Sequence, residues 1–519
     1  MRLTQGLARA AAVNPRGRAT VFRGVARTWE EVAARAARLA AGLRSFGLSP
    51  GDRVGVLALN SDRHLETLFA IPFAGLAAVP LNWRLTPEEL RLIVEDSGLR
   101  VLVTDAASLP LARAVTPRPR AWTHTVLIDG EAGPDEIGFE ALIAGSAPMA
   151  DAGAGGADLA GLYYTAGTTS ASKGVMLTHD NLVTNALSTG HAMGYDDRST
   201  YLHSGPMFHQ ADGASTFAVT LAAGCHAFVP RFDAEDCLAT LAAERVTHAQ
   251  FVPTMIRMLL DRPEIATLDL SALRRILYGA SPIEDETLRR ALTLLPNCGF
   301  VHGYGMTEVS STATMLPARY AVLEGPEAEK RRSCGQAALL GEVRVAGPDG
   351  ADLPPGEVGE VLIRGPQVMA GYWNRPEETA AALRGGWMHS GDLGWLDADG
   401  FLFLAGRLKD MIKTGGENVF AVEVENVVAE FDGVAEVAVI GLPHPVWTET
   451  VHAVVVPRAG ARVDPEALIA FCRARIAAYK APRSVEIRAE PLPLSAAGKI
   501  LKRVLRDEAA ARTAGAAEG

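Results

Sequence analysis

Residues Tyr163–Gly174 read YYTAGTTSASKG, a stretch that follows an apolar strand and precedes a helix start at Thr178-His179-Asp180. Its small and hydroxyl-bearing residues allow the backbone to approach a charged group closely, and threonine hydroxyls with main-chain N–H groups can surround phosphate oxygens. Lys173 adds a compact positive charge that suits a phosphate. We interpret the stretch as a phosphate-binding loop, and a flexible surface loop is the alternative.

Three other motif classes do not fit the chain. A Walker A loop beginning at Gly167 would need glycine at 172 and serine or threonine at 174, where the chain has Ser172 and Gly174. Residues Gly47–Gly51 match G-x-S-x-G, but a nucleophile elbow needs a strand before and a helix after, and the predicted order is the reverse. The histidines show no H-E-x-x-H or similar metal-ligand spacing.

The pattern around this loop predicts the fold class. Helices alternate with short apolar strands to about residue 320, which is typical of an α/β fold with layered, mainly parallel sheets. After about residue 335, short strands between Gly, Pro and Asp turns indicate a smaller antiparallel region. A compact α+β unit of ordinary domain size follows Arg407. We expect a large N-terminal domain over 1–407, a small C-terminal domain over 408–505 and a flexible tail over 506–519.

Composition excludes several classes of protein. The 519 residues are 48% hydrophobic and 21% charged, so a packed globular fold is expected. A net charge of −10 argues against general nucleic-acid binding. The five cysteines form no C-x-x-C pair, and the N-terminal segment lacks the apolar core of a signal peptide, so we expect a cytoplasmic protein. Two uncharged runs, 67–83 and 213–230, are short and interrupted by Gly or Pro, so no transmembrane segment is expected.

The second motif is VHGYGMTE, residues Val301–Glu308. Glycines on both sides of Tyr304 would let its ring lie against a planar ligand. Thr307 offers a hydroxyl, and Glu308 offers a hard oxygen for Mg²⁺. An ordinary Gly-Tyr-Gly bend is the alternative.

Three further motifs are weaker when each is taken alone. Asp392 in Ser390-Gly391-Asp392 could accept ribose hydroxyls or could be a turn residue. The segment Gly406–Asn418, GRLKDMIKTGGEN, concentrates basic residues at the predicted domain boundary, where a solvated turn is the alternative. The segment Leu494–Arg503, LSAAGKILKR, places a lysine on a small-residue loop that could reach into a cleft or simply be solvated.

In this order, the motifs resemble those of the adenylate-forming superfamily, which includes acyl- and aryl-CoA synthetases, luciferases and peptide-synthetase adenylation domains. The chain is most similar to the CoA ligases, and the resemblance extends from LNWRLTPEEL (81–90) through PMFHQADG (206–213), YGASPI (278–283) and GYW (371–373) to GKILKR (498–503). It implies a large N-terminal domain and a small mobile C-terminal domain joined near Lys409. It also implies a two-step reaction with ATP, Mg²⁺ and coenzyme A. A carboxylate attacks the α-phosphate to give acyl-AMP and pyrophosphate, and the thiol of CoA then attacks the acyl-AMP after the small domain rotates.

The resemblance assigns roles residue by residue. Lys499 matches the lysine that bridges carboxylate and α-phosphate oxygens, Thr307 would touch phosphate, Glu308 would hold Mg²⁺, and Lys409 sits at the hinge. The other residues that match nucleotide or CoA contacts are Thr165, Gly167, Thr168, Thr169, Lys173, Gly279, Ala280, Ser281, Tyr304, Gly305, Asp392, Arg407, Gly415, Gly416 and Trp447. Within that set, Tyr304 would flank adenine, Asp392 and Arg407 would hold ribose, and the paired glycines would line the pantetheine tunnel. For Trp447, ordinary packing is an alternative to a CoA contact.

Two stretches depart from the family pattern. The usual T-S-G-T-T-G-x-P-K-G becomes T-A-G-T-T-S-A-S-K-G, with Ala166, Ser170 and Ser172 as the changed positions. The ending P-L-S-A-A-G-K lacks an arginine that usually precedes Lys499. Neither change removes a residue to which we assign chemistry.

The acid is predicted from the residues that match the family's acyl pocket: His209, Phe251 and Gly303, together with Gly279-Ala280. Ligases that resemble malonate users carry arginine where this chain has Gly303, and without that cation a second carboxylate would lack a partner. We therefore expect a fatty or aromatic monocarboxylic acid. Polar neighbours such as Gln210 keep a hydroxylated or amino-substituted acid open, and His209 could gate the pocket or be structural.

Three hypotheses follow for function. The leading one is an ATP-dependent carboxylate–CoA ligase that acts on a small-molecule acid and has no nucleic-acid partner; a homodimer is left open. The second is an enzyme that adenylates an acid and transfers the acyl group to another acceptor, such as a carrier protein or an amine. The third is a catalytically silent nucleotide-binding regulator, supported only by the altered phosphate loop.

Overall fold

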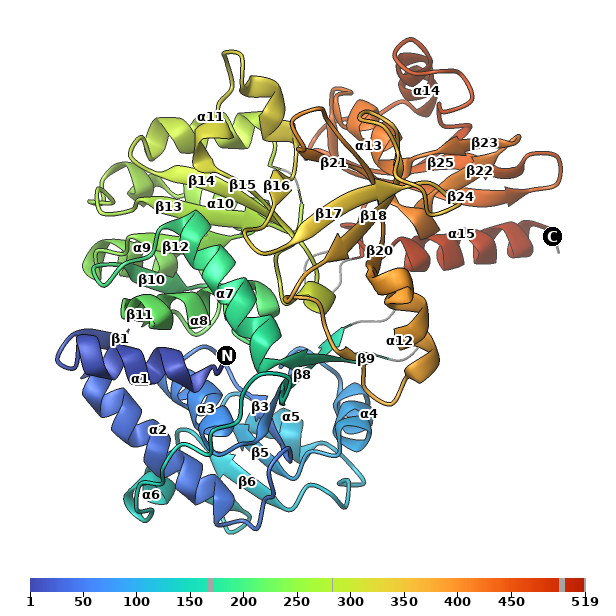
Figure 1. Cartoon of the computed structure of the whole chain (residues 1–519). Helices are drawn as coiled ribbons and strands as arrows, with labels where there is room; N and C mark the ends of the chain where they lie inside the picture. The colour runs from blue at the N-terminus through green and yellow to red at the C-terminus, as the bar shows by residue number, and fades with distance from the viewer. Residues whose placement is uncertain (166–171, 282, 494–499, 518–519) are drawn as a thin grey trace. The chain divides into compact units, whose positions relative to one another are not determined.

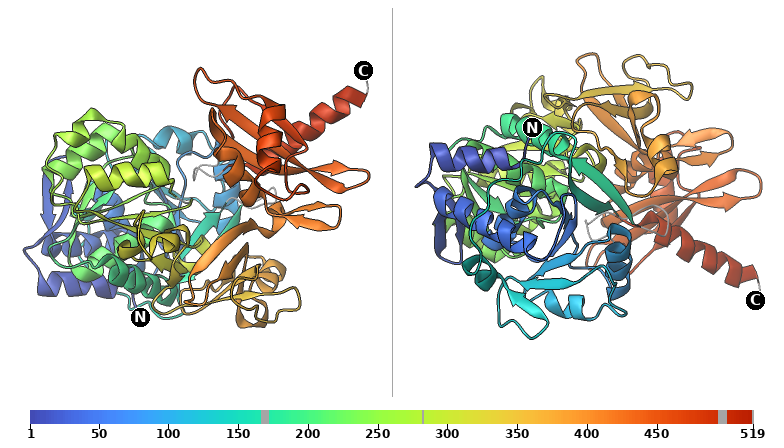
Figure 2. Two further views of the ribbon diagram at one scale, coloured as in Figure 1. Left: turned by 90° about the horizontal axis from the view of Figure 1, so that it is seen from above. Right: turned by 60° about the horizontal axis from the view of Figure 1, so that its bottom comes forward.

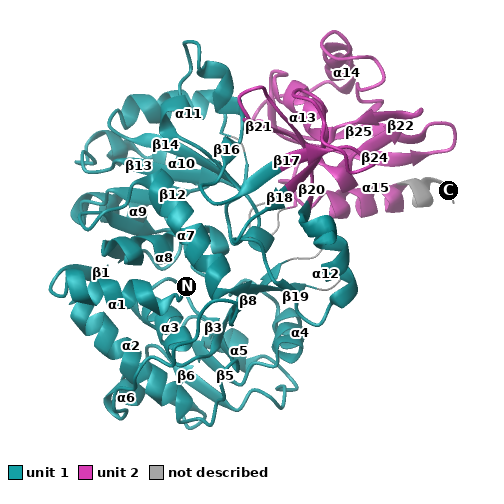
Figure 3. Ribbon diagram, in the orientation of Figure 1, with its two compact units in different colours: residues 1–343, 363–389 teal, residues 344–362, 390–519 magenta. Residues whose placement is uncertain are grey.

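The computed structural model describes residues 1–165, 172–281, 283–493 and 500–517, with side chains described up to Arg512. The chain divides into two compact units (Figure 3). Unit 1 comprises residues 1–343 and 363–389, and unit 2 comprises residues 344–362 and 390–519.

A nine-stranded sheet with a parallel centre forms half of unit 1. Parallel pairs join β14, β13, β12, β10, β11 and β1, while the edge strands β16, β15 and β2 are antiparallel to their neighbours. The spatial order is β16 (Gln336–Ala337), β15 (Thr314–Leu316), β14 (Gly299–Tyr304), β13 (Arg275–Gly279), β12 (His248–Phe251), β10 (Thr200–His203), β11 (Cys225–Phe228), β1 (Arg18–Phe22) and β2 (Val25–Thr28). The prediction of layered, mainly parallel sheets is confirmed.

An eight-stranded sheet forms the other half of unit 1. Its strands are parallel from β8 through β7, and only β9 and β19 at one edge run antiparallel to their neighbours. The order is β19 (Gly371–Tyr372), β9 (Lys173–Thr178), β8 (Leu159–Thr165), β4 (Ala77–Pro80), β3 (Arg53–Leu57), β5 (Val101–Thr104), β6 (His124–Leu127) and β7 (Glu136–Gly138). These strands are short apolar runs because both faces of the sheet are covered.

Helices α7 (His179–Met193) and α8 (Gln210–Ala222) form a layer between the two sheets (Figure 1). They pack against each other, α7 also packs on β8 and β9, and α8 packs on β10 and β11. The remaining helices of unit 1 are α1 (Thr4–Val13), α2 (Trp29–Arg44), α3 (Asp62–Phe73), α4 (Pro87–Ser97), α5 (Leu109–Arg113), α6 (Phe139–Ala144), α9 (Ala234–Ala243), α10 (Pro253–Leu260), α11 (Asp285–Leu294) and α12 (Pro376–Ala382). In the described ranges, no helix combines the length and apolar character needed to cross a lipid bilayer.

The helix starts follow from local capping. Thr28 accepts from the main-chain N–H of Glu31, whose carboxylate accepts from the N–H of Thr28 at 2.7 Å. Thr86 and Glu89 form the same reciprocal pair at the start of α4, with Pro87 as the first helical residue. Each box satisfies main-chain donors that the first helical turn leaves unpaired. The sequence pattern Thr-x-x-Glu at residues 28–31 and 86–89 predicts a helix start at each place, and the structure confirms both.

Unit 2 contains a four-stranded sheet and a C-terminal α+β region. The first sheet has the order β17 (Glu342–Ala346), β18 (Gly359–Arg364), β20 (Met388–Leu396) and β21 (Leu402–Arg407), and its β20–β21 pair is antiparallel as predicted. The second has the order β23 (Glu417–Val419), β22 (Ile412–Thr414), β25 (Thr448–Pro457) and β24 (Val434–His444), and β26 (Ser484–Ile487) pairs in parallel with β25. Its helices are α13 (Ala421–Ala429), α14 (Pro465–Arg473) and α15 (Lys502–Ala517).

The end of the chain differs from the sequence prediction. Residues 506–517, expected as part of a flexible tail, continue helix α15 (Figure 2). Leu505 and Ala509, one turn apart, are buried against Ala438, Ile440 and Val454 of the β24–β25 hairpin. Alanine is the strongest helix former, so an alanine-rich segment with two apolar anchors forms a helix.

The boundary between the units also differs from the predicted one at 407. Residues 344–362 and 390–407 belong with the C-terminal region in unit 2, because helix α13 packs against β21. The sequence has no local pattern that predicts this contact. Because unit 2 begins before residue 408, a separate mobile domain over 408–505 remains a proposal.

The five cysteines are buried thiols, distributed over unit 1 and the C-terminal region. Cys237 and Cys472 are fully enclosed by apolar neighbours in their respective cores. Burial raises the pKa of the Cys237 thiol to about 12, so this thiol is protonated and unreactive near neutral pH.

Candidate active site

The carboxyl ends of four parallel strands form one edge of the nine-stranded sheet. Strands β10, β12, β13 and β14 end at His203, Phe251, Gly279 and Tyr304. In this register Gly279 lies directly opposite Gly303. Open α/β sheets bind ligands at this edge, so the sheet brings two of the predicted motifs to a binding position.

The turn after β13 is built for close approach. A Cβ on Gly279 would lie 2.6 Å from the carbonyl oxygen of Gly303, so only glycine fits between the two strands. Ala280 adopts a left-handed conformation with φ of 69°, which is unusual for a residue other than glycine. Ala280 and Ser281 are exposed. The turn at residues 279–281 is therefore accessible at the sheet edge, and the predicted contact with nucleotide needs such access.

The segment after β14 turns back sharply on itself. A Cβ on Gly305 would lie 1.9 Å from the carbonyl oxygen of Ser311, and Ala313 N–H donates to the Tyr304 carbonyl at 2.7 Å. The Tyr304 side chain is only 8% exposed, so most of its ring is packed against protein. The fold explains why this motif needs Gly305.

Glu308 meets two other motifs at the edge of the eight-stranded sheet. Thr307 and Glu308 open a short 3₁₀ helix, η2 (Thr307–Val309), and both are partly exposed. The Tyr372 hydroxyl donates to Glu308 Oε1 at 2.9 Å, and Lys173 Nζ lies 5.0 Å from the centre of the Tyr372 ring. Burial, and secondarily the Glu308 charge, raises the pKa of Tyr372 well above its ordinary value, so the hydroxyl stays a donor. The predicted metal ligand and phosphate lysine are thus neighbours of one tyrosine.

The donor set fits Mg²⁺ better than a metal held by protein alone. Among the described residues, no group of three or more His, Cys, Asp or Glu side chains is placed to hold a metal ion. Mg²⁺ is usually held by one or two carboxylates together with substrate phosphates. Glu308 supplies one carboxylate beside a predicted phosphate loop, which is the arrangement that a nucleotide-bound Mg²⁺ requires.

The phosphate loop connects two strands of a hairpin. Thr165, the last residue of β8, lies opposite Lys173, the first residue of β9. The predicted contacts Gly167, Thr168 and Thr169 lie outside the described residues, and so does Lys499. The helix start predicted at Thr178-His179-Asp180 is confirmed, since Thr178 caps α7, but strand β9 before it was not predicted. The apolar residues of β9 pair with both β8 and β19, which favours a strand there.

The predicted acid segment caps helix α8. His209 is the N-cap residue, and its ring lies 4.6 Å from that of Phe208. Asn60 holds the preceding loop through its side chain, which donates to the Gly205 carbonyl at 2.7 Å and accepts from Met207 N–H at 2.9 Å. The Gln210 side chain is 4% exposed, and neither its Oε1 nor its Nε2 atom has a hydrogen-bond partner among the described residues. Burying an amide without hydrogen-bond partners destabilises the fold, typically by about 1–3 kcal/mol. A ligand that hydrogen-bonds to the amide would offset this penalty.

A buried polar network stands behind this segment. Asp212 accepts from the Tyr201 hydroxyl at 3.0 Å and lies 2.6 Å from His203 Nδ1. His203 Nε2 in turn lies 2.9 Å from His226. Burial lowers the pKa of His226 well below its ordinary value, so its imidazole is neutral near pH 7. The network fixes α8 to the sheet from within the core.

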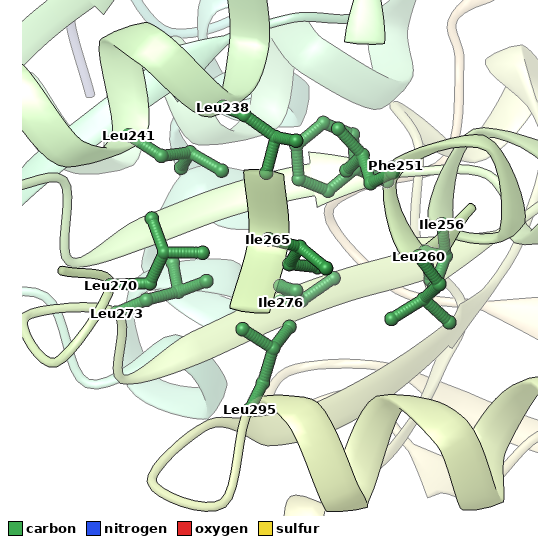
Figure 4. Close-up of a pocket in the computed structure, with 11 residues that line it drawn as sticks. Leu238, Leu241, Phe251, Ile256, Leu260, Ile265, Leu270, Leu273, Ile276 and Leu295 are labelled. Atoms are coloured by element: carbon green, nitrogen blue, oxygen red, sulfur yellow. The ribbon is translucent and has the colours of Figure 1, made fainter. Parts of the chain in front are cut away.

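Phe251 ends strand β12, but its side chain points into the core. Its ring is 1% exposed and lines a small apolar cavity with Leu241, Ile276 and Leu295 (Figure 4). Successive side chains on a strand point to opposite faces, and Phe251 points to the face covered by α9 and α10. The described structure therefore places this predicted acid contact in the core, while Gly303 and His209 stay near the strand ends.

The predicted ribose contacts lie together within unit 2. Asp392 on β20 is opposite Arg407 on β21, and Arg407 Nε lies 3.3 Å from Asp392 Oδ1. Lys409 follows in a short 3₁₀ helix, η6 (Leu408–Asp410). Burial and then the charge of Arg407 lower the pKa of Lys409 below its ordinary value. The predicted hinge lysine thus lies close to the predicted ribose contact Arg407.

The paired glycines form the β22–β23 turn under Trp447. Gly415 and Gly416 have φ of 62° and 86°, and Gly415 N–H donates to the Trp447 carbonyl at 2.9 Å. A Cβ on Gly415 would lie 2.8 Å from the Trp447 ring, so only glycine allows the ring to close over the turn. Arg483 stacks on the same ring at 4.7 Å. The sequence did not predict this contact of Arg483, because Arg483 is far from Trp447 in the chain and no local pattern connects them.

The chain is similar to known proteins over nearly its whole length. The family model described as AMP-binding enzyme matches residues 7–373, and the model for the AMP-binding enzyme C-terminal domain matches residues 423–499. Feruloyl-CoA synthase from Amycolatopsis sp is 40% identical over 501 residues, which cover 96% of this chain and 97% of the relative. A fatty acid–[acyl-carrier-protein] ligase from Streptomyces coeruleorubidus is 36% identical over 92% of this chain and 91% of its own. The solved structure of a Mycobacterium tuberculosis fatty acyl CoA synthetase is similar with a TM-score of 0.80 and 33% identity, covering 98% of this chain and 99% of that one.

Proposed function

Because the chain belongs to the AMP-binding enzyme family, we propose that it joins a carboxylic acid to coenzyme A through an acyl-adenylate. It is an acid–thiol ligase of the acyl-CoA synthetase branch, and its relatives act on fatty and aromatic acids. The observation that supports the proposal is that Lys173 and Glu308 both contact Tyr372, since a cation suited to phosphate and a carboxylate suited to a metal then lie close together.

In the first step an oxygen of the acid forms a bond to the α-phosphorus of ATP, and the bond to pyrophosphate breaks. Lys173 and the Thr165 end of the hairpin would hold the departing phosphates, and Lys499 would draw the two reacting anions together. Mg²⁺, held by Glu308, would supply neutralising charge to the phosphates. In the second step the sulfur of CoA attacks the acyl carbon, and AMP leaves with the former carboxylate oxygen.

We propose that the acid is an aromatic monocarboxylic acid with a hydrogen-bonding substituent. Gly303 offers no cation for a second carboxylate. The buried Gln210 amide, which has no partner in the described part of the chain, supplies a donor and an acceptor at the start of α8. The relative of 40% identity is a feruloyl-CoA synthase by name, and ferulic acid carries a phenolic hydroxyl.

A pyrophosphate-release screen over fatty, aromatic and dicarboxylic acids tests this function. We expect pyrophosphate only with monocarboxylic acids and, when CoA is present, AMP and an acyl-CoA product in amounts equal to the pyrophosphate. AMP formation without thioester across the whole panel would point to another acceptor, which the similarity to an acyl-carrier-protein ligase makes the second candidate. Absence of acid-dependent pyrophosphate exchange would leave a silent nucleotide-binding protein.

Replacing Gln210 with leucine tests the acid specificity. The variant keeps the volume but loses both hydrogen-bonding atoms, so we expect kcat/KM for ferulic acid to fall by about tenfold, as for one lost hydrogen bond of about 1.4 kcal/mol. The value for unsubstituted cinnamic acid, measured in the same assay, should stay the same or rise. An equal loss for both acids would show that Gln210 supports the fold instead of reading the substituent.

We further propose that the reaction takes place in the cytoplasm. All five cysteines are free, buried thiols. Proteins of oxidising compartments commonly have disulfides instead, so free thiols favour a reducing compartment. Retention of full activity in a reducing buffer, and its insensitivity to mild oxidants, would agree with this placement.

A further inference from the structure

The segment Gly371–Trp373 is tied to the surrounding structure on several sides. Strand β19, labelled in Figure 3, pairs with β9 so that Gly371 lies opposite Met176 and Tyr372 opposite Val175. Trp373 N–H donates to the Gly174 carbonyl at 2.8 Å, and its indole N–H donates to the Asp96 carbonyl at 3.0 Å. These contacts leave the backbone at Tyr372 little freedom.

The direction of the Tyr372 side chain follows from this anchoring. Trp373 packs with the apolar cluster beneath the eight-stranded sheet, which includes Leu162 and Met176. Neighbouring side chains on a strand point to opposite faces, so Tyr372 must point away from that cluster. Lys173, two residues before Val175 on β9, points to the same face and lies diagonally across from Tyr372.

Glu308 is attached to this segment at two points. Its main-chain carbonyl accepts from Met369 N–H at 2.8 Å, and its carboxylate Oε1 accepts from the Tyr372 hydroxyl at 2.9 Å. Main chain and side chain of the same residue are therefore both positioned by residues 369–372. Tyr372 engages Oε1 only, which leaves Oε2 as the oxygen to face a cation.

The same tyrosine separates two opposite charges. Its ring face meets the Lys173 ammonium, while its hydroxyl meets the Glu308 carboxylate. Lys173 and Glu308 each contact Tyr372, and in the ranges that the structure describes no ion pair joins the two. A direct pair would neutralise both groups, whereas a tyrosine between them keeps the cation available to phosphate and the carboxylate available to metal.

We propose that Tyr372 is a positioning residue that presents Glu308 to the metal of the bound nucleotide and keeps Lys173 apart from it. The inference rests on the proposed function, because it requires a metal–nucleotide complex as the ligand. Hydrogen bonds to a metal-binding carboxylate fix its orientation, and their loss typically weakens metal affinity about 10- to 100-fold.

The test measures metal binding directly, without turnover. Wild-type enzyme and variants are saturated with the unreactive analogue α,β-methylene-ATP and titrated with Mn²⁺, whose free fraction is read by electron paramagnetic resonance. Tyr372→Phe removes only the hydroxyl, and we expect it to weaken Mn²⁺ binding about tenfold. Tyr372→Ala also removes the ring, and we expect it to weaken binding of the metal-free analogue as well, because Lys173 can then approach Glu308.

Tyr195→Phe is the control. Tyr195 lies just after helix α7, outside every motif assigned to nucleotide or metal, and its hydroxyl lies 3.1 Å from Ser215 Oγ. This variant also loses one hydrogen-bonded tyrosine hydroxyl, so it should bind Mn²⁺ like the wild type. If Tyr195→Phe weakens Mn²⁺ binding as much as Tyr372→Phe does, general loosening of the fold explains the loss and the inference is overturned.

A second variant tests whether Tyr372 affects metal binding through Glu308 or in another way. Glu308→Gln should weaken Mn²⁺ by itself, and adding Tyr372→Phe to it should have no further effect if the tyrosine acts through the carboxylate. Additive losses would overturn the inference. Wild-type enzyme that binds neither the analogue nor Mn²⁺ would instead contradict the proposed function, whereas normal wild-type binding with unchanged Tyr372→Phe affinity would contradict only the role of Tyr372.

Discussion

Replacing Lys499 with alanine is expected to slow acyl-adenylate formation on the order of a hundred- to a thousandfold, the range typical of removing one charge-stabilising group from a reacting centre. By its match to the family, the Lys499 ammonium would bridge an oxygen of the acid and an oxygen of the α-phosphate. Without it, two anions approach each other with no cation between them. Attack of CoA on a finished acyl-adenylate needs no such bridge, so thioester formation from supplied acyl-adenylate should be largely retained.

The two half-reactions are measured separately, as acid-dependent pyrophosphate exchange and as acyl-CoA formation from synthetic acyl-adenylate. Lys502→Ala is the matched control, since Lys502 is near in sequence and pairs with Glu425 at 2.7 Å on the C-terminal region. It should leave both rates close to those of the wild type. An equal loss of both half-reactions in Lys499→Ala would contradict the assigned role.

Replacing Lys409 with proline should have the opposite effect. Lys409 lies in η6 between β21 and β22, and proline there fixes its φ and restricts Leu408 before it. If the region after this point must rotate between the two steps, a stiff hinge holds the thiol away from the acyl carbon. We expect thioester formation to fall on the order of a hundredfold, as for a misplaced reacting group, while adenylation changes much less.

Lys409→Ala separates the backbone from the ammonium, because alanine keeps the rotation about φ and removes only the side chain. Thioester formation should be faster in this variant than in Lys409→Pro. Both half-reactions are followed as for the Lys499 variants. A loss of adenylation as large as the loss of thioester formation in Lys409→Pro would show that the proline disturbs the site itself.

Local signals predicted much of the fold. The capping boxes at Thr28 and Thr86 mark helix starts because each box satisfies its donors within one turn. The apolar runs of the parallel strands are equally local. Strand β9 was missed because its pairing with β19, nearly two hundred residues later in the chain, decides its conformation. The same holds for the unit boundary, which depends on α13 packing against β21.

In the candidate site, too, features set by local sequence were predicted and features set by distant contacts were not. Glycines were informative because each fits a place where a Cβ would clash: Gly279 against Gly303, Gly305 against Ser311, and Gly415 against Trp447. Phe251 was assigned to the acid pocket by segment alone, although strand alternation turns its ring into the core. Tyr372 lies in a motif that sequence reasoning quoted, yet its partner Glu308 is 64 residues away, and no local pattern connects them.

The burial of all five thiols makes the proposed rotation open to fluorescence measurement. Maleimide dyes react with exposed thiols, so native cysteines need not be removed before labelling. Val13 in unit 1 and Val446 in unit 2 are 58% and 73% exposed, and cysteines introduced there would take up a donor and an acceptor dye. Energy transfer between the dyes, followed as acid, ATP and CoA are added in turn, would report each rearrangement of the two units in real time.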